Sequence, residues 1–88
     1  MSITVIVALK IEDYGKFESS FAKRASARVA AGIEAKAYRD MDDASKVVAI
    51  GTAPSKEAFL GFMTSPEQQQ AMKNAGIQGP PDITFLEE

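Results

Sequence analysis

The sequence contains no cysteine, no histidine and no tryptophan. The absence of cysteine excludes disulfides and thiolate metal sites. The absence of histidine removes the commonest general base, the commonest metal ligand and the usual haem ligand. Many catalytic and metal centres are therefore excluded at the outset, and we expect no cofactor.

The chain is also short and carries little net charge. Its 88 residues predict one domain spanning residues 1–88, and a domain of this size buries only about 60–65% of its unfolded surface. Without disulfides or a metal, oligomerisation is the remaining means of stabilising it. A net charge of −2 with both signs interspersed does not supply the basic surface that nucleic-acid binding needs.

Long hydrophobic runs are lacking as well. The apolar stretch Ile3–Leu9 ends at Lys10, which makes it too short to cross a membrane, and no cationic region of a signal peptide precedes it. We therefore expect a cytoplasmic protein that has no membrane partner.

What the sequence does contain is a series of strand-like segments. Residues 3–11, "ITVIVALKI", are rich in β-branched side chains and apolar on both faces, which is typical of a central strand. Residues 33–40 alternate apolar and polar side chains and predict a half-exposed strand. The polar turn "MDDAS" then leads into residues 46–53, which predict a second central strand.

A helix is expected between the first two strands, over residues 14–31. Asp13 can cap its first turn, and Gly32 can follow its last residue. Side chains at spacings of three and four predict one core-facing stripe, made of Tyr14, Phe17, Phe21, Ala25 and Val29. Basic side chains off this stripe are expected to form a solvated face, namely Lys23, Arg24 and Arg28.

A second helical region begins near Pro54 and is expected to bend near Thr64. Ser65 supplies an N-cap, Pro66 suits the first helical position, and Gln68 is placed to complete a capping box. The buried face of this region is expected to hold apolar side chains, namely Ala58, Phe59, Phe62, Met63, Ala71, Met72 and Ala75.

The last strand follows two adjacent prolines. Pro80 and Pro81 cannot donate to a β-ladder, so we expect the strand to span only Ile83–Leu86, at a sheet edge beside the first strand. Because Gly79 precedes a proline, extended geometry is expected there. We also expect this strand or the following Glu87-Glu88 to contact a second subunit.

The order β-α-β-β-α-β predicts an α+β, ferredoxin-like unit. Its four-stranded antiparallel sheet would place the first and third strands in the centre and both helical regions on one face. The uncovered face would then carry apolar side chains, namely Ile6 and Ala8 with either Val48 and Ile50 or Val47 and Ala49. Such a face is not expected to remain in water, so we expect a homodimer in which two sheets meet.

With this order on the page, four segments carry a family resemblance: "VIVALKIEDYGKFESSF", "YRDMDDASKVVAIGTA", "SPEQQQAM" and "GPPDITFLEE". Together they resemble small proteins of the dimeric α+β barrel superfamily, which includes antibiotic-biosynthesis monooxygenases. The ending "GPP…FLEE" resembles a small subgroup of unknown function. The resemblance covers nearly the whole chain and implies a homodimer that encloses a barrel, often with a ligand cavity in each subunit.

The resemblance also implies a range of activities. Enzymes of the superfamily include cofactor-independent monooxygenases, isomerases and lactone-forming enzymes, and some members carry the label cyclase. Haem-degrading members use a histidine ligand, usually with a tryptophan and an asparagine. Here Asn74 is the only asparagine and the other two residue types are missing, so that catalytic set is not carried over.

Several side chains are candidates for lining a cavity that takes a small apolar or aromatic ligand, either neutral or anionic. Tyrosine can exchange a proton, arginine can hold a carboxylate or enolate, and a desolvated lysine can act as a base or bind an anion. The candidates are Thr4, Lys10, Tyr14, Tyr38, Arg39, Phe62 and Thr84.

Each main candidate has a structural alternative. Tyr38 can pack at a strand or dimer edge, and Arg39 can pair with an aspartate of the following turn. Lys10 can reach solvent, while Tyr14 and Phe62 can belong to the core. The aspartates of the turn, Asp40, Asp42 and Asp43, lack the glycine and distal glutamate of a calcium loop, so we expect turn formers and no metal site.

Two functions remain open from the sequence. The first is small-molecule binding or a cofactor-independent reaction of monooxygenase, isomerase or cyclase type in an apolar cavity of the dimeric barrel. The second is a non-catalytic dimerisation or binding module with a packed barrel interior. The sequence does not decide whether the protein is an enzyme, because the fold alone does not determine function.

Overall fold

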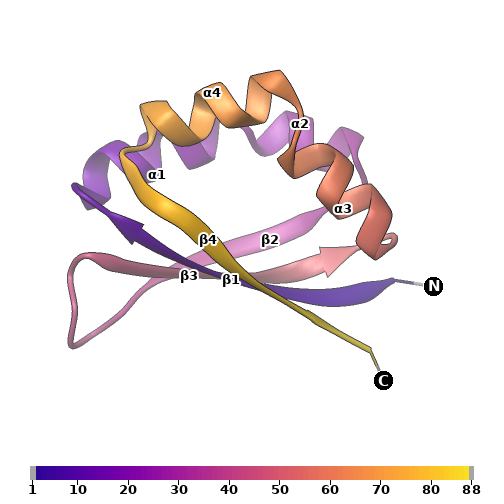
Figure 1. The fold of residues 1–88 in the computed structure, drawn as a ribbon, viewed down its shortest axis with the longest axis horizontal. Coiled ribbons are helices and arrows are strands. Elements are labelled where there is room, and N and C mark those ends of the chain that lie inside the picture. The colour runs from indigo at the N-terminus through magenta and orange to yellow at the C-terminus, as the bar shows by residue number, and fades with distance from the viewer. Residues whose placement is uncertain (1, 88) are drawn as a thin grey trace.

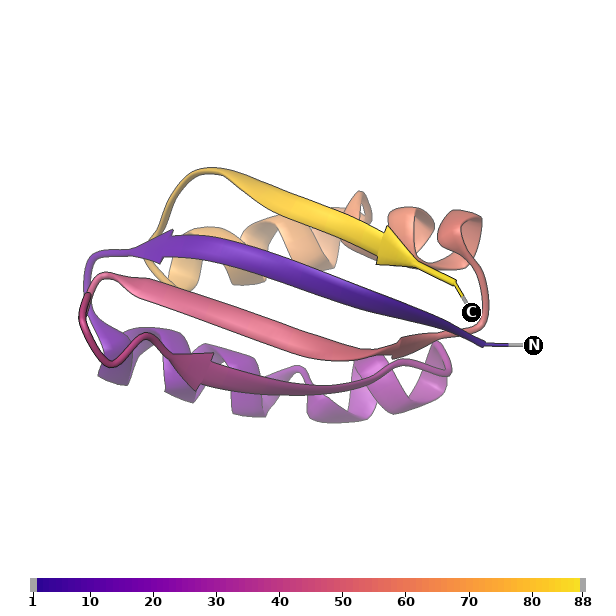
Figure 2. The same ribbon diagram turned by 90° about the horizontal axis from the view of Figure 1, so that it is seen from below.

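A computed structural model describes residues 2–87. Its sheet is antiparallel with strand order β2-β3-β1-β4, and all the helices cover one face (Figures 1 and 2). The elements in chain order are β1 Ile3–Ile11, α1 Tyr14–Lys23, α2 Ala25–Ala30, β2 Glu34–Arg39, β3 Lys46–Ala53, α3 Lys56–Met63, α4 Pro66–Asn74 and β4 Ile77–Leu86. The predicted α+β, ferredoxin-like fold with β1 and β3 in the centre is confirmed.

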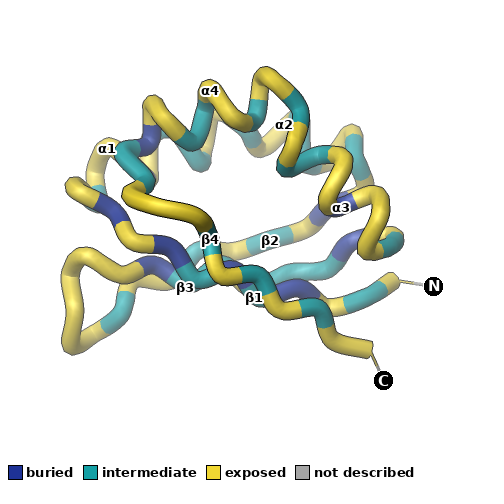
Figure 3. Tube along the Cα trace, in the orientation of Figure 1, coloured by how far each residue is buried: buried dark blue, intermediate teal, exposed yellow. Residues whose placement is uncertain are grey.

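The core lies between the sheet and the helix layer (Figure 3). Alternate residues of β1 point toward the helices and are buried, namely Val5, Val7, Leu9 and Ile11. Phe17 of α1 and Phe59 of α3 pack against them and are 3% and 6% exposed. This helix-facing side of the sheet therefore carries the apolar face that the β1 pattern predicts.

The sequence predicted one helix over the first helical region. The structure has two, because the helix breaks at Arg24. Asp13 caps the start as expected, accepting from Lys16 N at 3.2 Å. At the break, the carbonyl oxygen of Phe21 accepts from Arg24 N at 3.2 Å and from Arg28 Nη1 at 2.9 Å. These donors take the acceptor that a continuous helix would offer to Ala25.

The core-facing side chains of this region also differ from the predicted ones. Ala25 and Val29 were expected on the core stripe, but both are exposed, Val29 by 73%. Arg24 and Arg28, expected on a solvated face, are partly buried instead. The helix ends as predicted, because Gly32 has φ +75° and Ile33 N donates to the carbonyl of Arg28 at 2.8 Å, which forms a Schellman ending.

The second helical region divides into α3 and α4 with a break at residues 64–65, as predicted. Ser65 is the N-cap and accepts from Gln68 N at 3.3 Å. The capping-box prediction is wrong in its second half, because the Gln68 side chain accepts a hydrogen bond from Arg24 instead. Ala58 was expected in the buried face but is exposed, whereas Phe59 is buried.

The prediction that β4 begins after the prolines is wrong. The strand spans Ile77–Leu86 and pairs with β1 of its own chain, as expected. Gln78 pairs with Lys10 and Asp82 with Ala8, so residues 79–81 form a bulge opposite one residue of β1. A bulge needs no ladder donors, which allows both prolines to stay within the strand.

Gly79 provides the geometry of that bulge. Its φ is +77°, so the expectation of extended backbone before Pro80 is also wrong. Glycine adopts positive φ without the Cβ clash that other residues meet. Of the terminal residues expected to contact a second subunit, Glu88 lies outside the described residues.

The strand register settles which side chains lie on the uncovered face. Ile6 pairs with Ile50 and Ala8 with Val48, and directly paired residues share a face. The central strands therefore place an apolar patch on the face opposite the helices, named here the open face. Ile50 is 44% exposed there. Within residues 2–87, no helix has the length and apolar character that a membrane-crossing segment needs.

Candidate functional site

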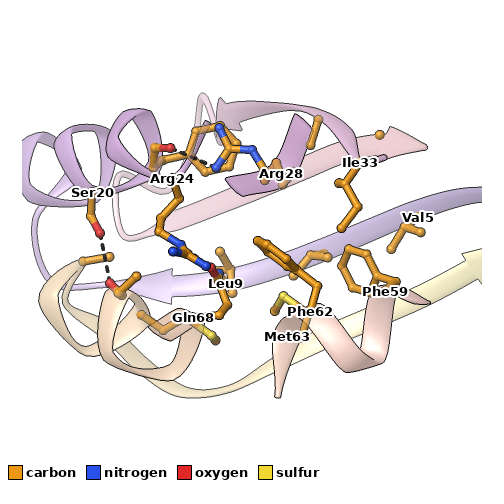
Figure 4. Close-up of a pocket in the computed structure, with 18 of the residues that line it drawn as sticks. Val5, Leu9, Ser20, Arg24, Arg28, Ile33, Phe59, Phe62, Met63 and Gln68 are labelled. Atoms are coloured by element: carbon orange, nitrogen blue, oxygen red, sulfur yellow. Dashed lines mark hydrogen bonds between the residues drawn. The ribbon is translucent and has the colours of Figure 1, made fainter. Parts of the chain in front are cut away.

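A cavity of about 90 Å³ lies between the helix layer and the helix-facing side of the sheet. Figure 4 shows its lining side chains, with α1 and α2 on one side and α3 and α4 on the other. It is named here the helix–sheet cavity. For scale, a closed apolar cavity of about 150 Å³ holds benzene, so an aromatic ligand would fit only after flexible lining side chains such as Met63 move aside.

Small residues in the sheet create the space. Ala35 of β2 pairs with Gly51 of β3, and Ala37 pairs with Ala49. Ala35, Ala49 and Gly51 line the cavity. On β1 the same side of the sheet carries valine and leucine. The small side chains therefore leave space above β2 and β3, whereas larger side chains occupy the space above β1.

Aromatic side chains and methionine form the walls. Phe17 and Phe21 of α1 stack with ring centroids 5.5 Å apart. Phe59, Phe62 and Met63 of α3 also line the cavity (Figure 4). Rings of this kind accept offset or edge-on contact with a planar ligand, and methionine adapts its shape to an irregular one.

Arg28 brings a positive charge to this apolar cavity. Its Nη1 donates to the carbonyl oxygen of Phe21 at 2.9 Å, and its guanidinium carbon lies 3.7 Å from the centroid of the Phe21 ring. Burial lowers the pKa of Arg28 and the nearby charge of Arg24 lowers it further. Both effects disfavour the charged form, so the cavity holds a cation that the surrounding protein stabilises poorly.

Arg24 lies one helical turn away and also lines the cavity. Its Nε donates to Oε1 of Gln68 on α4 at 2.9 Å, as Figure 4 shows, and its guanidinium carbon is 5.4 Å from the Phe62 ring centroid. Ser20 Oγ donates to the carbonyl oxygen of Ala71 at 2.9 Å. These two hydrogen bonds join α1 to α4 beside the cavity.

Neither arginine is neutralised by a carboxylate within residues 2–87. The ion pair found in that part of the chain joins Lys16 to Glu12, at 2.7 Å, away from the cavity. Glu34 belongs to the lining, but its pairing with Thr52 places its side chain on the open face. The helix–sheet cavity is therefore apolar with an excess of positive charge.

Four of the predicted site residues lie on the open face, away from this cavity. The register pairs Lys10 with Lys46, Tyr38 with Val48 and Thr84 with Ile6. The four are Thr4, Lys10, Tyr38 and Thr84. Whether they line a cavity depends on what covers the open face, so their role stays a prediction.

The other three predicted residues lie on the helix-facing side. Phe62 lines the helix–sheet cavity. Tyr14 packs against the core, and the guanidinium carbon of Arg39 lies 4.9 Å from the centroid of its ring. Arg39 therefore contacts Tyr14, and no ion pair with the aspartates of the following turn forms among the described residues.

Those aspartates act as turn formers. Asp40 Oδ1 accepts from Asp42 N at 2.8 Å and from Asp43 N at 3.2 Å. Hydrogen bonds from the Ser45 side chain and backbone lower the pKa of the Asp43 carboxyl group. Over residues 2–87, no three acidic side chains gather in a way that could hold a metal ion.

Sequence reasoning missed Arg24 and Arg28 as site residues. The usable signal was their spacing, because positions 17, 21, 24 and 28 continue one helical stripe as well as 17, 21, 25 and 29 do. The apolar character of Ala25 and Val29 favoured the wrong continuation. A long arginine side chain can occupy a core-facing position by packing its stem and stacking its guanidinium.

Comparison with known proteins identifies the class of fold. No protein-family model matches the sequence, and no curated protein matches it. Solved structures do match over nearly the full chain, and several of them are antibiotic biosynthesis monooxygenases by name. The α+β fold of the superfamily that the sequence resembles is thereby confirmed.

Three of these structures illustrate the match. A candidate antibiotic biosynthesis monooxygenase from Bordetella bronchiseptica superposes with TM-score 0.83 at 15% identity, covering 99% of this chain and 96% of that one. SnoaB, a cofactor-independent oxygenase from Streptomyces nogalater, gives 0.77 at 15% identity, covering 99% and 92%. A conserved protein from Methanosarcina mazei gives 0.78 at 8% identity, covering 100% and 93%.

Proposed function

We propose that this protein binds a small, planar, largely apolar compound in the helix–sheet cavity. The observation that carries the proposal is the contrast between the floor and the walls. Alanines at positions 35 and 49 leave space where larger side chains would complete the core, while aromatic rings line the sides. Natural cores are packed to high density, so a hollow of this kind at the centre of the fold is typical of a ligand site.

Filling the floor tests this proposal. Ala49→Leu should occupy the cavity, so it should remove the stabilisation that toluene and indole give to the unaltered protein. A ligand at about ten times its Kd adds about 1.4 kcal/mol, which corresponds to a rise in Tm of roughly 6–11 °C for a domain of this size. Thermal unfolding followed by circular dichroism measures the rise.

Ala58→Leu is the matched control, because Ala58 is exposed on α3 and lies outside the cavity lining. This variant should respond to both compounds as the unaltered protein does. An equal rise in Tm for Ala49→Leu and Ala58→Leu would show that the compounds bind elsewhere. No rise in Tm for the unaltered protein with any single-ring or two-ring compound would contradict the proposal.

The match to SnoaB supports a second candidate function, the oxygenation of the bound compound without a cofactor. Conversion of an activated methylene group and O2 to a carbonyl group and water balances without a further reductant, so the protein would supply enclosure and orientation. Oxygen uptake with 1,3-indandione as the probe tests it. Uptake should exceed the buffer rate and fall to it in Ala49→Leu, and no excess over buffer would contradict this activity.

For the open face, we propose a second copy of this chain as the covering partner, which would form the dimeric barrel. The support is the apolar patch of Ile6, Ala8, Val48 and Ile50, together with the marginal stability of so short a chain. Contiguous apolar patches on a sheet are typical of protein interfaces. In such a dimer Thr4, Lys10, Tyr38 and Thr84 would lie near the partner.

An acidic side chain in the patch tests the assembly. Ile6→Glu should convert a dimer to a monomer, because it would bury an unpaired carboxylate opposite Ile50. Sedimentation equilibrium at micromolar concentrations measures the mass. Leu60→Glu is the control, since Leu60 is 38% exposed on α3, on the other side of the molecule, and this variant should stay dimeric. A monomeric unaltered protein, or a dimeric Ile6→Glu variant, would contradict the proposal.

A further inference from the structure

The helix–sheet cavity has an electrostatic character that the apolar lining alone does not explain. Arg24 and Arg28 both line it, one helical turn apart, and neither forms an ion pair with a carboxylate within residues 2–87. Both side chains are partly buried, and arginine removed from water is normally paired. The positive charge at this position therefore points to a partner that the chain itself does not supply.

From this we infer that the ligand of the helix–sheet cavity is an aromatic oxyanion, a compound whose ring lies among the phenylalanines and whose negatively charged oxygen meets Arg24 and Arg28. The inference rests on the proposed function and names its ligand class. Carboxylate and phenolate oxygens share the required chemistry, because both accept charge-assisted hydrogen bonds from guanidinium groups.

The geometry leaves both arginines able to receive such an oxygen. Arg24 uses Nε for Gln68, at 2.9 Å, and Arg28 uses Nη1 for the carbonyl of Phe21, also at 2.9 Å. The remaining N–H groups of both guanidiniums have no hydrogen-bond partner among the described residues. Each guanidinium is thus held by one hydrogen bond and keeps other donors for a ligand.

The rings support the same assignment. The Arg28 guanidinium stacks on Phe21 at 3.7 Å, and the Arg24 guanidinium lies 5.4 Å from the Phe62 ring centroid. These contacts fix the direction of the charges relative to the aromatic walls. An aromatic acid would present its ring to the walls and its oxygen to the guanidiniums in one orientation.

Isosteric pairs of compounds test the inference directly. Benzoate and 2-naphthoate should each bind more tightly than benzamide and 2-naphthamide, which have nearly the same shape without the charge, by about tenfold or more. Phenol derivatives that ionise near neutral pH separate phenolate from carboxylate as the oxyanion. Isothermal titration measures each affinity, and the advantage of the acid should shrink as the salt concentration rises.

Gln68→Glu is the sharpest variant because it places a carboxylate beside Arg24 at the position of the present amide oxygen. It should act as an internal substitute for the ligand, so the preference for acid over amide should fall about tenfold while Tm rises. Arg24→Gln should also reduce the preference. Lys23→Gln, which removes a charge from an exposed position of the same helix, is the control and should leave the preference unchanged.

The outcomes separate this inference from the proposed function. If neither acid binds more tightly than its amide, or if Gln68→Glu keeps the full preference, the oxyanion assignment is overturned. Loss of all binding in Ala49→Leu together with equal binding of acid and amide would leave the cavity as a neutral-ligand site. Acid preference that survives Ala49→Leu would place the charge recognition outside the cavity and overturn the inference.

Discussion

Gly51→Ala is expected to lose at least about 3 kcal/mol of unfolding free energy. A Cβ atom at Gly51 would overlap the carbonyl oxygen of Glu34 and lie 2.7 Å from Cα of Ala35. These are backbone atoms of β2, so relief requires the two strands to separate. Overpacking against movable side chains typically costs 1–3 kcal/mol, and we expect about the top of that range or more here.

Such a loss is a large part of the stability of the protein. Native domains are stable by about 0.05–0.15 kcal/mol per residue, and each kcal/mol shifts Tm by roughly 4–8 °C at this size. The variant should therefore unfold roughly 12–24 °C lower or fail to fold, as thermal denaturation followed by circular dichroism would show.

Gly61→Ala is the control for this prediction. Nothing lies within 4 Å of a Cβ built at Gly61, which is an exposed position of α3. Alanine is favoured over glycine inside a helix, so this variant should gain about 0.4–1 kcal/mol. A Gly51→Ala variant as stable as Gly61→Ala would show that β2 and β3 can move apart at no cost.

The fold could be predicted from the sequence because its signals are local and periodic. Alternation marked the strands, and the caps Asp13, Ser65 and Gly32 marked helix ends at positions that the structure confirms. The register could not be predicted, since β3 is apolar on both faces. The pairing of Ile6 with Ile50 decides it, and that is a tertiary contact.

The site was harder to predict because it depends on departures from those local rules. At the break near Arg24, the Arg28 side chain donates to the carbonyl oxygen of Phe21, seven residues earlier, and no periodic pattern reports such a contact. In the sequence, Ala35 contributed only to the prediction of a half-exposed strand, and Ala49 only to the prediction of a central one. Their role appears once β2 and β3 lie side by side beneath the helices.

The same departures connect fold to function. Arg24 and Arg28 continue the helical spacing of Phe17 and Phe21, so both arginines follow the stripe that faces the cavity. Hydrogen bonds from Arg24 to Gln68 and from Arg28 to the carbonyl of Phe21 hold the two side chains there. The two arginines therefore give positive charge to a cavity whose walls are otherwise apolar.

A chain that ends at Gly79, without residues 80–88, is expected to be unfolded or aggregated. It loses the part of β4 that pairs with residues 4–8 of β1, and with it Phe85, whose ring contacts Phe59 edge-on at 5.8 Å. β1 would then become an edge strand that is apolar on both faces. An uncovered edge of this kind pairs readily with other chains.

The bulge at residues 79–81 explains why the loss would be complete. Gln78 and Ile77 alone would still pair with β1, but two residues before a bulge cannot hold a strand in register. A chain that ends at Leu86 is the control, because it keeps all of β4, and it should remain soluble and unfold cooperatively. Gel filtration and thermal unfolding compare the two, and a folded, soluble monomer ending at Gly79 would show that β1 needs no partner on this side.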